Sequence, residues 1–380
     1  MSHKIKSAAV VGGGWAGAVT AHKRTEAGWR VEVFERSDRV GGHSRAETLN
    51  GVLYEPNGAH IFHTSNREVA TFVNQFGLVR PYEHCVLTEI FEHDDDDVPT
   101  VLSWPPQVDE LKDLWMWPTV ERELATLPAA PSGDDFESFV VSLMGETLYR
   151  LFIYGYTVKQ WGCEPSTLSS SFAPKRVDLR SDNFRRLFRD QWEYFSPSGI
   201  NDVIESVLRP VAVTCGAEIG VQDLDALSKS FDLAVVTAPL DRFVGRDGEL
   251  AWRGVTMRSR YEPTEHGGDT VTAAYVVNRP SMRVPYTRTI ETKHASGQQI
   301  RGTVVSEEYP GSPARHYPFP TIDRRYEAMN ERLKDEVRNS SPLPVYFAGR
   351  LANYQYIDQD QAIAQAFACA ATILESHGSA

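Results

Sequence analysis

The stretch that decides the fold runs from Ala8 to Glu35 and reads AAVVGGGWAGAVTAHKRTEAGWRVEVFE. Its first apolar run, expected to be a strand, ends at a glycine turn in which Gly12, Gly14 and Gly17 have GxGxxG spacing. A helical stretch and a second apolar run follow, and the latter ends on Glu35. Such a turn lets a pyrophosphate approach the backbone at a helix N-terminus, and the acid can bind ribose hydroxyls. The sequence therefore predicts a dinucleotide-binding α/β domain.

The composition of the 380-residue chain is that of an ordinary globular protein with a large core. Its net charge of −12 argues against sequence-independent nucleic-acid binding, which depends on Lys and Arg side chains that neutralise phosphates. We expect no membrane span, because no apolar run reaches about 18 residues, and no signal peptide, because the first strand begins too early. The four cysteines lack metal-binding spacing, which favours reduced thiols in a cytoplasmic protein.

Strand and helix patterns recur along the chain, so the nucleotide-binding sheet is expected to combine separate segments. We expect helices over 66–76, 137–156 and 178–191 and from 361 onward. Strands are expected at 211–214, 233–237 and 345–347, with a strand-rich zone over 270–307. The acidic run 92–97 is expected to be an exposed hairpin tip, and a cation site is the alternative.

A second glycine pair, Gly41 and Gly42, follows the acid Glu35 within a few residues. In FAD enzymes such a pair lets the chain pass close to the dinucleotide, so FAD is the predicted cofactor. The predicted fold is α/β: a Rossmann-type FAD-binding fold with an inserted helical domain and an antiparallel β-sheet domain. The expected segments are 1–80, 196–245 and 326–380 for the dinucleotide-binding domain, 105–170 for the helical substrate domain, 171–195 for a mobile lid and cleft wall, and 81–104 with 246–325 for the sheet domain.

From the segment GAHIFHT at 58–64 onward, the chain resembles the UDP-galactopyranose mutase family. Collinear matches cover almost the whole chain: GYTVKQWG at 155–162, KR at 175–176, VPYTR at 284–288, EYP at 308–310, HYP at 316–318 and GRLA at 349–352. The resemblance implies an isomerase that interconverts the pyranose and furanose forms of a nucleotide-diphosphate sugar without net redox change. It also implies that the flavin is reduced and that its N5 atom attacks the anomeric carbon.

The resemblance implies a role for each matched residue. Arg176, on the lid, and Arg288 match arginines that bind the diphosphate, and guanidinium groups suit phosphate oxygens. His63 matches a histidine near the flavin, and these three form the predicted catalytic set. The implied substrate-binding residues are Tyr156 at the nucleobase, Trp161 at the sugar, Tyr317 and Tyr356 at the diphosphate, and Asp358 in the cleft. The implied cofactor-binding residues are Gly12, Gly14, Gly17, Glu35, Gly41, Gly42, His60 and Arg350.

Each of these side chains also has a structural alternative. A single arginine is more often a surface residue or a salt-bridge partner, and a single tyrosine is more often part of a core or interface. His60 can equally be a hydrogen-bonded core histidine, and Trp161 can serve packing alone.

The chain departs from the family pattern in the segment that contacts the nucleobase. The usual YQGIP is absent, and an ungapped alignment places Trp192–Ser196 there. Trp192 is therefore a predicted substrate-binding residue in an altered base-binding wall. A GDP-linked sugar is the hypothesis that this change raises beside a UDP-galactose-like substrate.

A second departure lies at Asp358 and Asp360, two carboxylates expected near His60 and His63. Carboxylate oxygens suit Mg²⁺ or Mn²⁺, so a flavin-independent, metal-dependent sugar mutase is an alternative. The other interpretation of these acids is a helix N-cap. An FAD-dependent oxidase or desaturase and a non-catalytic nucleotide-sugar-binding relative are further alternatives. Oligomeric state stays open, with a homodimer as one option.

Overall fold

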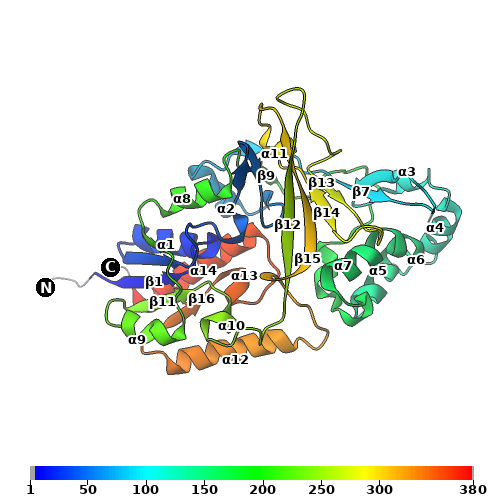
Figure 1. The fold of residues 1–380 in the computed structure, drawn as a ribbon. Coiled ribbons are helices and arrows are strands. Elements are labelled where there is room, and N and C mark those ends of the chain that lie inside the picture. Colours follow the sequence, from blue (N-terminus) through cyan, green and yellow to red (C-terminus); the bar gives the residue numbers. More distant parts are fainter. Residues whose placement is uncertain (1–4, 94, 379–380) are drawn as a thin grey trace.

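The computed structural model describes residues 5–93 and 95–378. A parallel five-stranded sheet forms the centre of what we call the N-terminal lobe, with strand order β10-β2-β1-β11-β16. The sheet combines segments from the beginning, middle and end of the chain, as the sequence predicts (Figure 1). Its strands are β1 (Ser7–Val11), β2 (Arg30–Glu35), β10 (Ala212–Cys215), β11 (Leu233–Val236) and β16 (Val345–Phe347).

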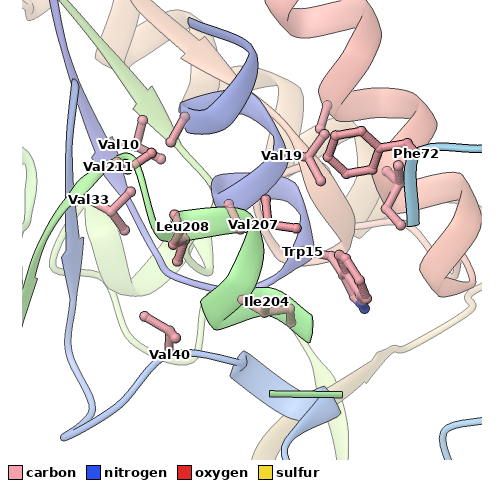
Figure 2. Packing of buried hydrophobic residues seen from close by; sticks show 14 of the residues in the cluster. Val10, Trp15, Val19, Val33, Val40, Phe72, Ile204, Val207, Leu208 and Val211 are labelled. Atoms are coloured by element: carbon pink, nitrogen blue, oxygen red, sulfur yellow. The ribbon is translucent and has the colours of Figure 1, made fainter. Parts of the chain in front are cut away.

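Strand β1 is buried on both faces, and its alternate residues pack against different helix layers. Val10 packs in a cluster with α1 (Trp15–Glu26), α2 (Arg67–Gln75), α8 (Ile200–Leu208) and α14 (Gln359–His377). In this cluster, Val207 and Leu208 of α8 lie beside α1 (Figure 2). Val11 packs in a second cluster with α9 (Leu224–Leu227), α10 (Leu240–Phe243) and α12 (Arg325–Ser340).

A six-stranded sheet, the central sheet, stands between the N-terminal lobe and a group of helices (Figure 1). Its order is β12-β15-β14-β13-β7-β8. The expectation of an antiparallel sheet is wrong for one pair, because β13 and β7 run parallel. Strands from separate chain segments can pair in either direction, since no tight turn joins them. The strands are β7 (Val86–Ile90), β8 (Thr100–Trp104), β12 (Trp252–Glu262), β13 (Val276–Asn278), β14 (Arg288–Ile290) and β15 (Thr303–Pro318).

The helical lobe has its own buried core, around residues such as Met144, Tyr149 and Phe152. The single helix expected over 137–156 is interrupted at Gly145, whose φ is +84°. The helices of this lobe are α3 (Val108–Leu111), α4 (Trp117–Leu124), α5 (Phe136–Met144), α6 (Glu146–Leu148), the π-helical turn η2 (Tyr149–Tyr154) and α7 (Gly155–Trp161).

The expected helix over 178–191 is absent, and this segment is irregular. Arg180, which is 6% exposed, donates hydrogen bonds to the carbonyl oxygens of Phe184, Arg186 and Leu187. The segment folds back on itself, and the Arg180 guanidinium group donates the hydrogen bonds that backbone N–H groups would donate in a helix. Arg180 therefore stabilises a loop at this place instead of the expected helix.

Shorter elements complete the fold. Strand β9 (Trp192–Phe195) pairs with β5 (Phe62–Thr64) and β6 (Arg80–Pro81), and β3 (Glu47–Leu49) pairs with β4 (Val52–Tyr54). The remaining helices are η1 (Gly42–Ser44), η3 (Pro165–Thr167), η4 (Ser170–Lys175), η5 (Val221–Asp223), α11 (Lys293–Ser296) and α13 (Gly349–Ala352).

The acidic run at 92–97 lies between the antiparallel strands β7 and β8, as a hairpin tip would. Asp95 and Asp97 are exposed, and Asp94 lies outside the described residues. Among the described helices, none combines the length and hydrophobicity needed to cross a bilayer.

Candidate active site

The glycine turn after β1 leaves no room for side chains at Gly12 and Gly17. Gly12 has a φ of +107°, and a Cβ on Gly17 would lie 1.9 Å from the Gly12 carbonyl oxygen. A Cβ on Gly42 would lie 3.3 Å from the Gly14 Cα, so the second glycine pair passes directly beside the first. Gly17 and Gly42 are therefore required by close backbone approach at the start of α1, and Gly12 by its positive φ as well.

The N-terminus of α1 is open toward an anionic ligand. Gly14 is its N-cap and supplies no side-chain acceptor to the N–H groups of the first turn. Glu35 accepts the Gly13 N–H at 2.7 Å and the Ser37 N–H at 2.8 Å, which holds its carboxylate beside the turn. Free N–H groups, the helix dipole and a fixed carboxylate fit a dinucleotide whose pyrophosphate lies over the turn.

A cavity of about 320 Å³ opens where the N-terminal lobe, the central sheet and the helical lobe meet. Segments far apart in the sequence contribute its walls, so only the tertiary fold creates it. Ten of the residues singled out from the sequence line this one cavity: His60, His63, Tyr156, Trp161, Arg176, Arg288, Tyr317, Arg350, Tyr356 and Asp358.

Two of the three cavity arginines form ion pairs with carboxylates. Arg176 Nη2 lies 2.8 Å from Asp358 Oδ1, and Arg288 Nη2 lies 2.7 Å from Glu308 Oε2. The Glu308 side chain is fully buried, so this pair sits in a region of low dielectric. The pairs fix the guanidinium groups in place while leaving other N–H donors for phosphate oxygens.

Arg350, the third arginine, is held by backbone carbonyls. It donates to the oxygens of Ile357 at 2.9 Å and His316 at 3.0 Å. Its guanidinium carbon lies 5.8 Å from the ring centre of Tyr317 and 5.4 Å from that of Tyr356. These contacts orient both tyrosines next to positive charge.

Burial controls the ionisation of the aromatic wall. It raises the pKa of Tyr156 to about 12, and it raises the pKa of Tyr317 further. Both phenols therefore keep their protons at neutral pH and can donate hydrogen bonds to a bound anion. Tyr317 and Tyr356 meet edge to face with ring centres 5.2 Å apart, and Trp161 packs in the core of the helical lobe while lining the cavity.

Five histidines line the cavity, of which the sequence singled out His60 and His63. Burial lowers the pKa of His60 and His84 to about 3 and that of His316 to about 4. His43 is stacked on His316 at 4.4 Å, and burial lowers its pKa as well. These four rings are thus neutral at physiological pH.

The residues around Asp358 act as a helix cap. Asp358 is the N-cap of α14, and its N–H donates to Gln361 Oε1 at 3.1 Å. Asp360 accepts hydrogen bonds from the Thr64 hydroxyl at 3.0 Å and from the Gln361 N–H at 2.7 Å. Within the described residues, no group of three or more His, Cys, Asp or Glu side chains is placed to hold a metal ion. The metal alternative is therefore not supported.

Trp192 lies elsewhere than the sequence suggests. It pairs with Thr64 in the small sheet and packs against the core of the N-terminal lobe, and it is not among the residues that line the cavity. Leu187 and Phe188, from the irregular segment before it, line the cavity instead. Sequence analysis did not identify these two residues, nor His43, His84 and His316, as parts of the cavity. The RVGGH and HYP segments, which contain His43 and His316, were the available signal for two of them.

A family model for UDP-galactopyranose mutase matches residues 151–356, more than half of the chain. The chain belongs to the UDP-galactopyranose mutase family. A model for NAD(P)-binding Rossmann-like domains matches residues 10–76. As a family member, the protein is an isomerase that interconverts pyranose and furanose forms of nucleotide-linked sugars, and FAD is its cofactor.

Relatives of similar length agree with this assignment. A probable UDP-galactopyranose mutase of Klebsiella pneumoniae is 28% identical, with 98% of this chain and 95% of the relative covered. A dTDP-fucopyranose mutase of Escherichia coli is 24% identical, with 97% and 98% covered. The fold is shared with a crystal structure of a reduced UDP-galactopyranose mutase (TM-score 0.75, 17% identity, 98% and 96% covered). A putative protoporphyrinogen oxidase from Exiguobacterium also has this fold (TM-score 0.63, 13% identity, 98% of both chains covered), so fold alone does not decide the reaction.

Proposed function

We propose that the substrate is a pyrimidine nucleoside-diphosphate hexose, with UDP-galactose as the first candidate. The two relatives described above are named for UDP- and dTDP-linked sugars. A rebuilt base wall at Trp192 would favour GDP, but Trp192 lies outside the cavity lining. We assign the pyrimidine base to the side of the cavity at Tyr156 of α7, and Asn278 of β13 also lines the cavity.

The observation that carries the diphosphate part of this proposal is the convergence of three arginines and three tyrosines on one cavity. We assign the diphosphate to Arg176 and Arg288, with Tyr317 and Tyr356 as neutral donors. The negative charge of a departing diphosphate grows in the transition state, and fixed guanidinium groups stabilise it without reorganisation. An oxidase or desaturase that acts on an apolar substrate would not need this set of phosphate-binding donors.

FAD is assigned to the glycine turn and the adjoining cavity. Gly12, Gly14, Gly17, Gly41 and Gly42 would hold the pyrophosphate, Glu35 the ribose, and His60 and Arg350 the flavin side of the cavity. Bound FAD in its reduced form supplies a nucleophile for the anomeric carbon. The protein holds the sugar in place, stabilises the leaving diphosphate and keeps water out of the closed cavity.

The test is anaerobic conversion of UDP-galactopyranose, with dithionite as reductant and separation of the two ring forms by chromatography. The purified protein should show a flavin absorption band, and it should convert the sugar only after reduction. Displacement of bound UDP-sugar by UDP but not by GDP would support the pyrimidine assignment. Tight binding of GDP with none of UDP would overturn it, and a purified protein without flavin would overturn the assignment of the glycine turn.

The four cysteines are free in the structure, which supports a cytoplasmic location for the protein.

A further inference from the structure

We propose that Asp190 is a positioning residue that holds His63 in one tautomer, so that Nε2 of His63 can exchange a proton with sugar hydroxyls in the cavity. The catalytic part of this inference rests on the proposed function. The positioning part concerns only the folded protein.

A short hydrogen bond defines the pair. Asp190 Oδ2 lies 2.7 Å from His63 Nδ1, and Asp190 Oδ1 accepts the Ser65 hydroxyl at 2.7 Å. The hydrogen bond with His63 lowers the pKa of Asp190, so the group is a carboxylate at neutral pH. Because a carboxylate only accepts hydrogen bonds, neutral His63 must carry its proton on Nδ1. Its Nε2 then has a lone pair.

Packing prevents the His63 ring from turning. Phe188 stacks on it with ring centres 3.5 Å apart and planes at 10°, and the His63 side chain is 13% exposed. The backbone is fixed as well, because His63 pairs with Glu193 between β5 and β9. His63 lines the cavity, and in the described part of the chain its Nε2 has no hydrogen-bond partner. This atom is therefore available to a ligand.

The reaction needs a group that carries a proton. When a pyranose contracts, the bond from C1 to the C5 oxygen breaks and that oxygen gains a proton. The bond from C1 to the C4 oxygen forms, and that hydroxyl loses a proton. If Nε2 of His63 takes up the proton of the C4 hydroxyl on its lone pair and then gives that proton to the C5 oxygen, His63 ends each turnover in its starting state. The Asp190 carboxylate stabilises the imidazolium form in this cycle.

No other cavity histidine is as well placed for this role. Burial holds the pKa of His60 and His84 near 3 and that of His316 near 4, so protonating them at neutral pH is too costly. Arg176, Asp358 and Asp360 lie in the same region, but the first two are paired with each other, and Asp360 is bonded to Thr64 and Gln361. His60 Nδ1 lies 3.9 Å from Glu55 Oε1, which is too long for a hydrogen bond, whereas His63 has a carboxylate at 2.7 Å and an open ring nitrogen.

The test compares wild type with Asp190→Asn. Nitrogen-15 NMR of histidine-labelled protein, recorded without substrate, should show His63 protonated on Nδ1 in the wild type. The introduced side-chain amide would offer N–H donors to the ring, so in the variant the proton should move toward Nε2. We expect kcat to fall by about 10²-fold, the usual contribution of acid–base catalysis, with KM changed less than about threefold.

Two further variants complete the design. Asp190→Glu retains a carboxylate and should recover the tautomer and part of kcat. Ser65→Ala removes the other partner of Asp190 and should leave the His63 tautomer unchanged. A wild-type His63 protonated on Nε2, or an Asp190→Asn variant with normal kcat, would overturn the inference. If the tautomer shifts as expected but the wild type turns over no sugar nucleotide, the proposed function fails while the positioning role of Asp190 stands.

Discussion

The cavity arginines show how single residues combine stability with binding. Arg288 neutralises the buried Glu308, and the same guanidinium group faces the cavity where we place the diphosphate. A buried carboxylate without its partner is strongly destabilising, so the two roles cannot be separated by deleting one residue. They can be separated by changing both members of the pair.

Arg288→Gln is expected to lower kcat by about 10²- to 10³-fold, because one fixed charge at the leaving group is lost. It should also lower the free energy of unfolding by about 3 kcal/mol, because Glu308 is left buried and unpaired. Adding Glu308→Gln should restore much of the stability and none of the kcat. Steady-state kinetics and urea unfolding measure the two effects.

Arg260→Gln is the matched control for this substitution. Arg260 lies on β12 and pairs with Glu262 and Glu307 at the exposed side of the same sheet. Surface ion pairs contribute about 0 to 1 kcal/mol, so both kcat and stability should stay close to wild type. Equal losses of kcat in Arg260→Gln and Arg288→Gln would contradict a specific role for Arg288.

The buried histidines predict a pH dependence of stability. Folding lowers the pKa of His60, His84 and His316 to about 3 to 4, so between those values and about 6.5 the unfolded chain binds more protons. The free energy of unfolding should therefore fall as the pH falls from 7 to 5. Burial raises the pKa of Glu55 to about 7 and also raises the pKa of Glu193 and Asp360, and these carboxyl groups oppose the trend.

Urea midpoints at about pH 7.5 and about pH 5 measure this effect. His84→Asn, which cannot be protonated, should show a smaller fall in stability between the two pH values than wild type, by up to about 1.4 kcal/mol per pH unit. An identical fall in both proteins would mean that His84 is charged in the folded state.

At the scale of elements, Gly14 and Gly17 of the unit β1-α1-β2 are needed for two different reasons. A Cβ on Gly17 would collide with the Gly12 carbonyl, whereas the nearest atom to a Cβ on Gly14 is the Gly42 Cα at 3.8 Å, an ordinary contact. Gly14 therefore keeps the turn open for a ligand, while Gly17 is needed for the turn to form at all.

Gly14→Ala should leave the unfolding free energy of the flavin-free protein nearly unchanged and reduce bound flavin strongly, because the new methyl group lies where the pyrophosphate would approach. Gly17→Ala should lower both. The ratio of flavin absorbance to protein absorbance and urea unfolding of the flavin-free proteins report the two quantities. Full flavin content in Gly14→Ala would contradict a dinucleotide over this turn.

The segments that the sequence predicted wrongly are those shaped by particular side-chain contacts, either within the segment or with distant strands. Arg180 satisfies carbonyls of its own segment and so replaces the expected helix over 178–191. Trp192 joins a small sheet with β5 and packs on the N-terminal core. The local sequence pattern could not reveal either result. Residue preferences for helices or strands are averages over many proteins, and the contacts of a particular residue can override them.

At the scale of the whole molecule, the cavity belongs to no single lobe. Arg176 follows η4 on the segment that we expect to act as a lid, and its ion pair with Asp358 ties that segment to the N-terminal lobe. A bound diphosphate would bridge Arg176 to Arg288 of the central sheet. Ligand binding should therefore restrain the lid with respect to both other parts.

Hydrogen exchange followed by mass spectrometry tests this coupling. Saturating UDP should slow amide exchange in residues 171–195, and it should leave exchange in α12, on the far side of the N-terminal sheet, unchanged. Binding of UDP without protection of 171–195 would contradict the assignment of this segment as a lid.

The sequence by itself determined the dinucleotide-binding unit and the family, because these depend on local spacing: three glycines, an acid at the end of β2 and collinear motifs. It also identified ten residues of the cavity through those motifs. Only the tertiary structure decided that Asp190 and Phe188 hold His63, that His84 and His316 complete the wall, and that Arg176 pairs with Asp358. The physical reason is that burial and pairing depend on which distant segments meet, and local sequence carries little of that information.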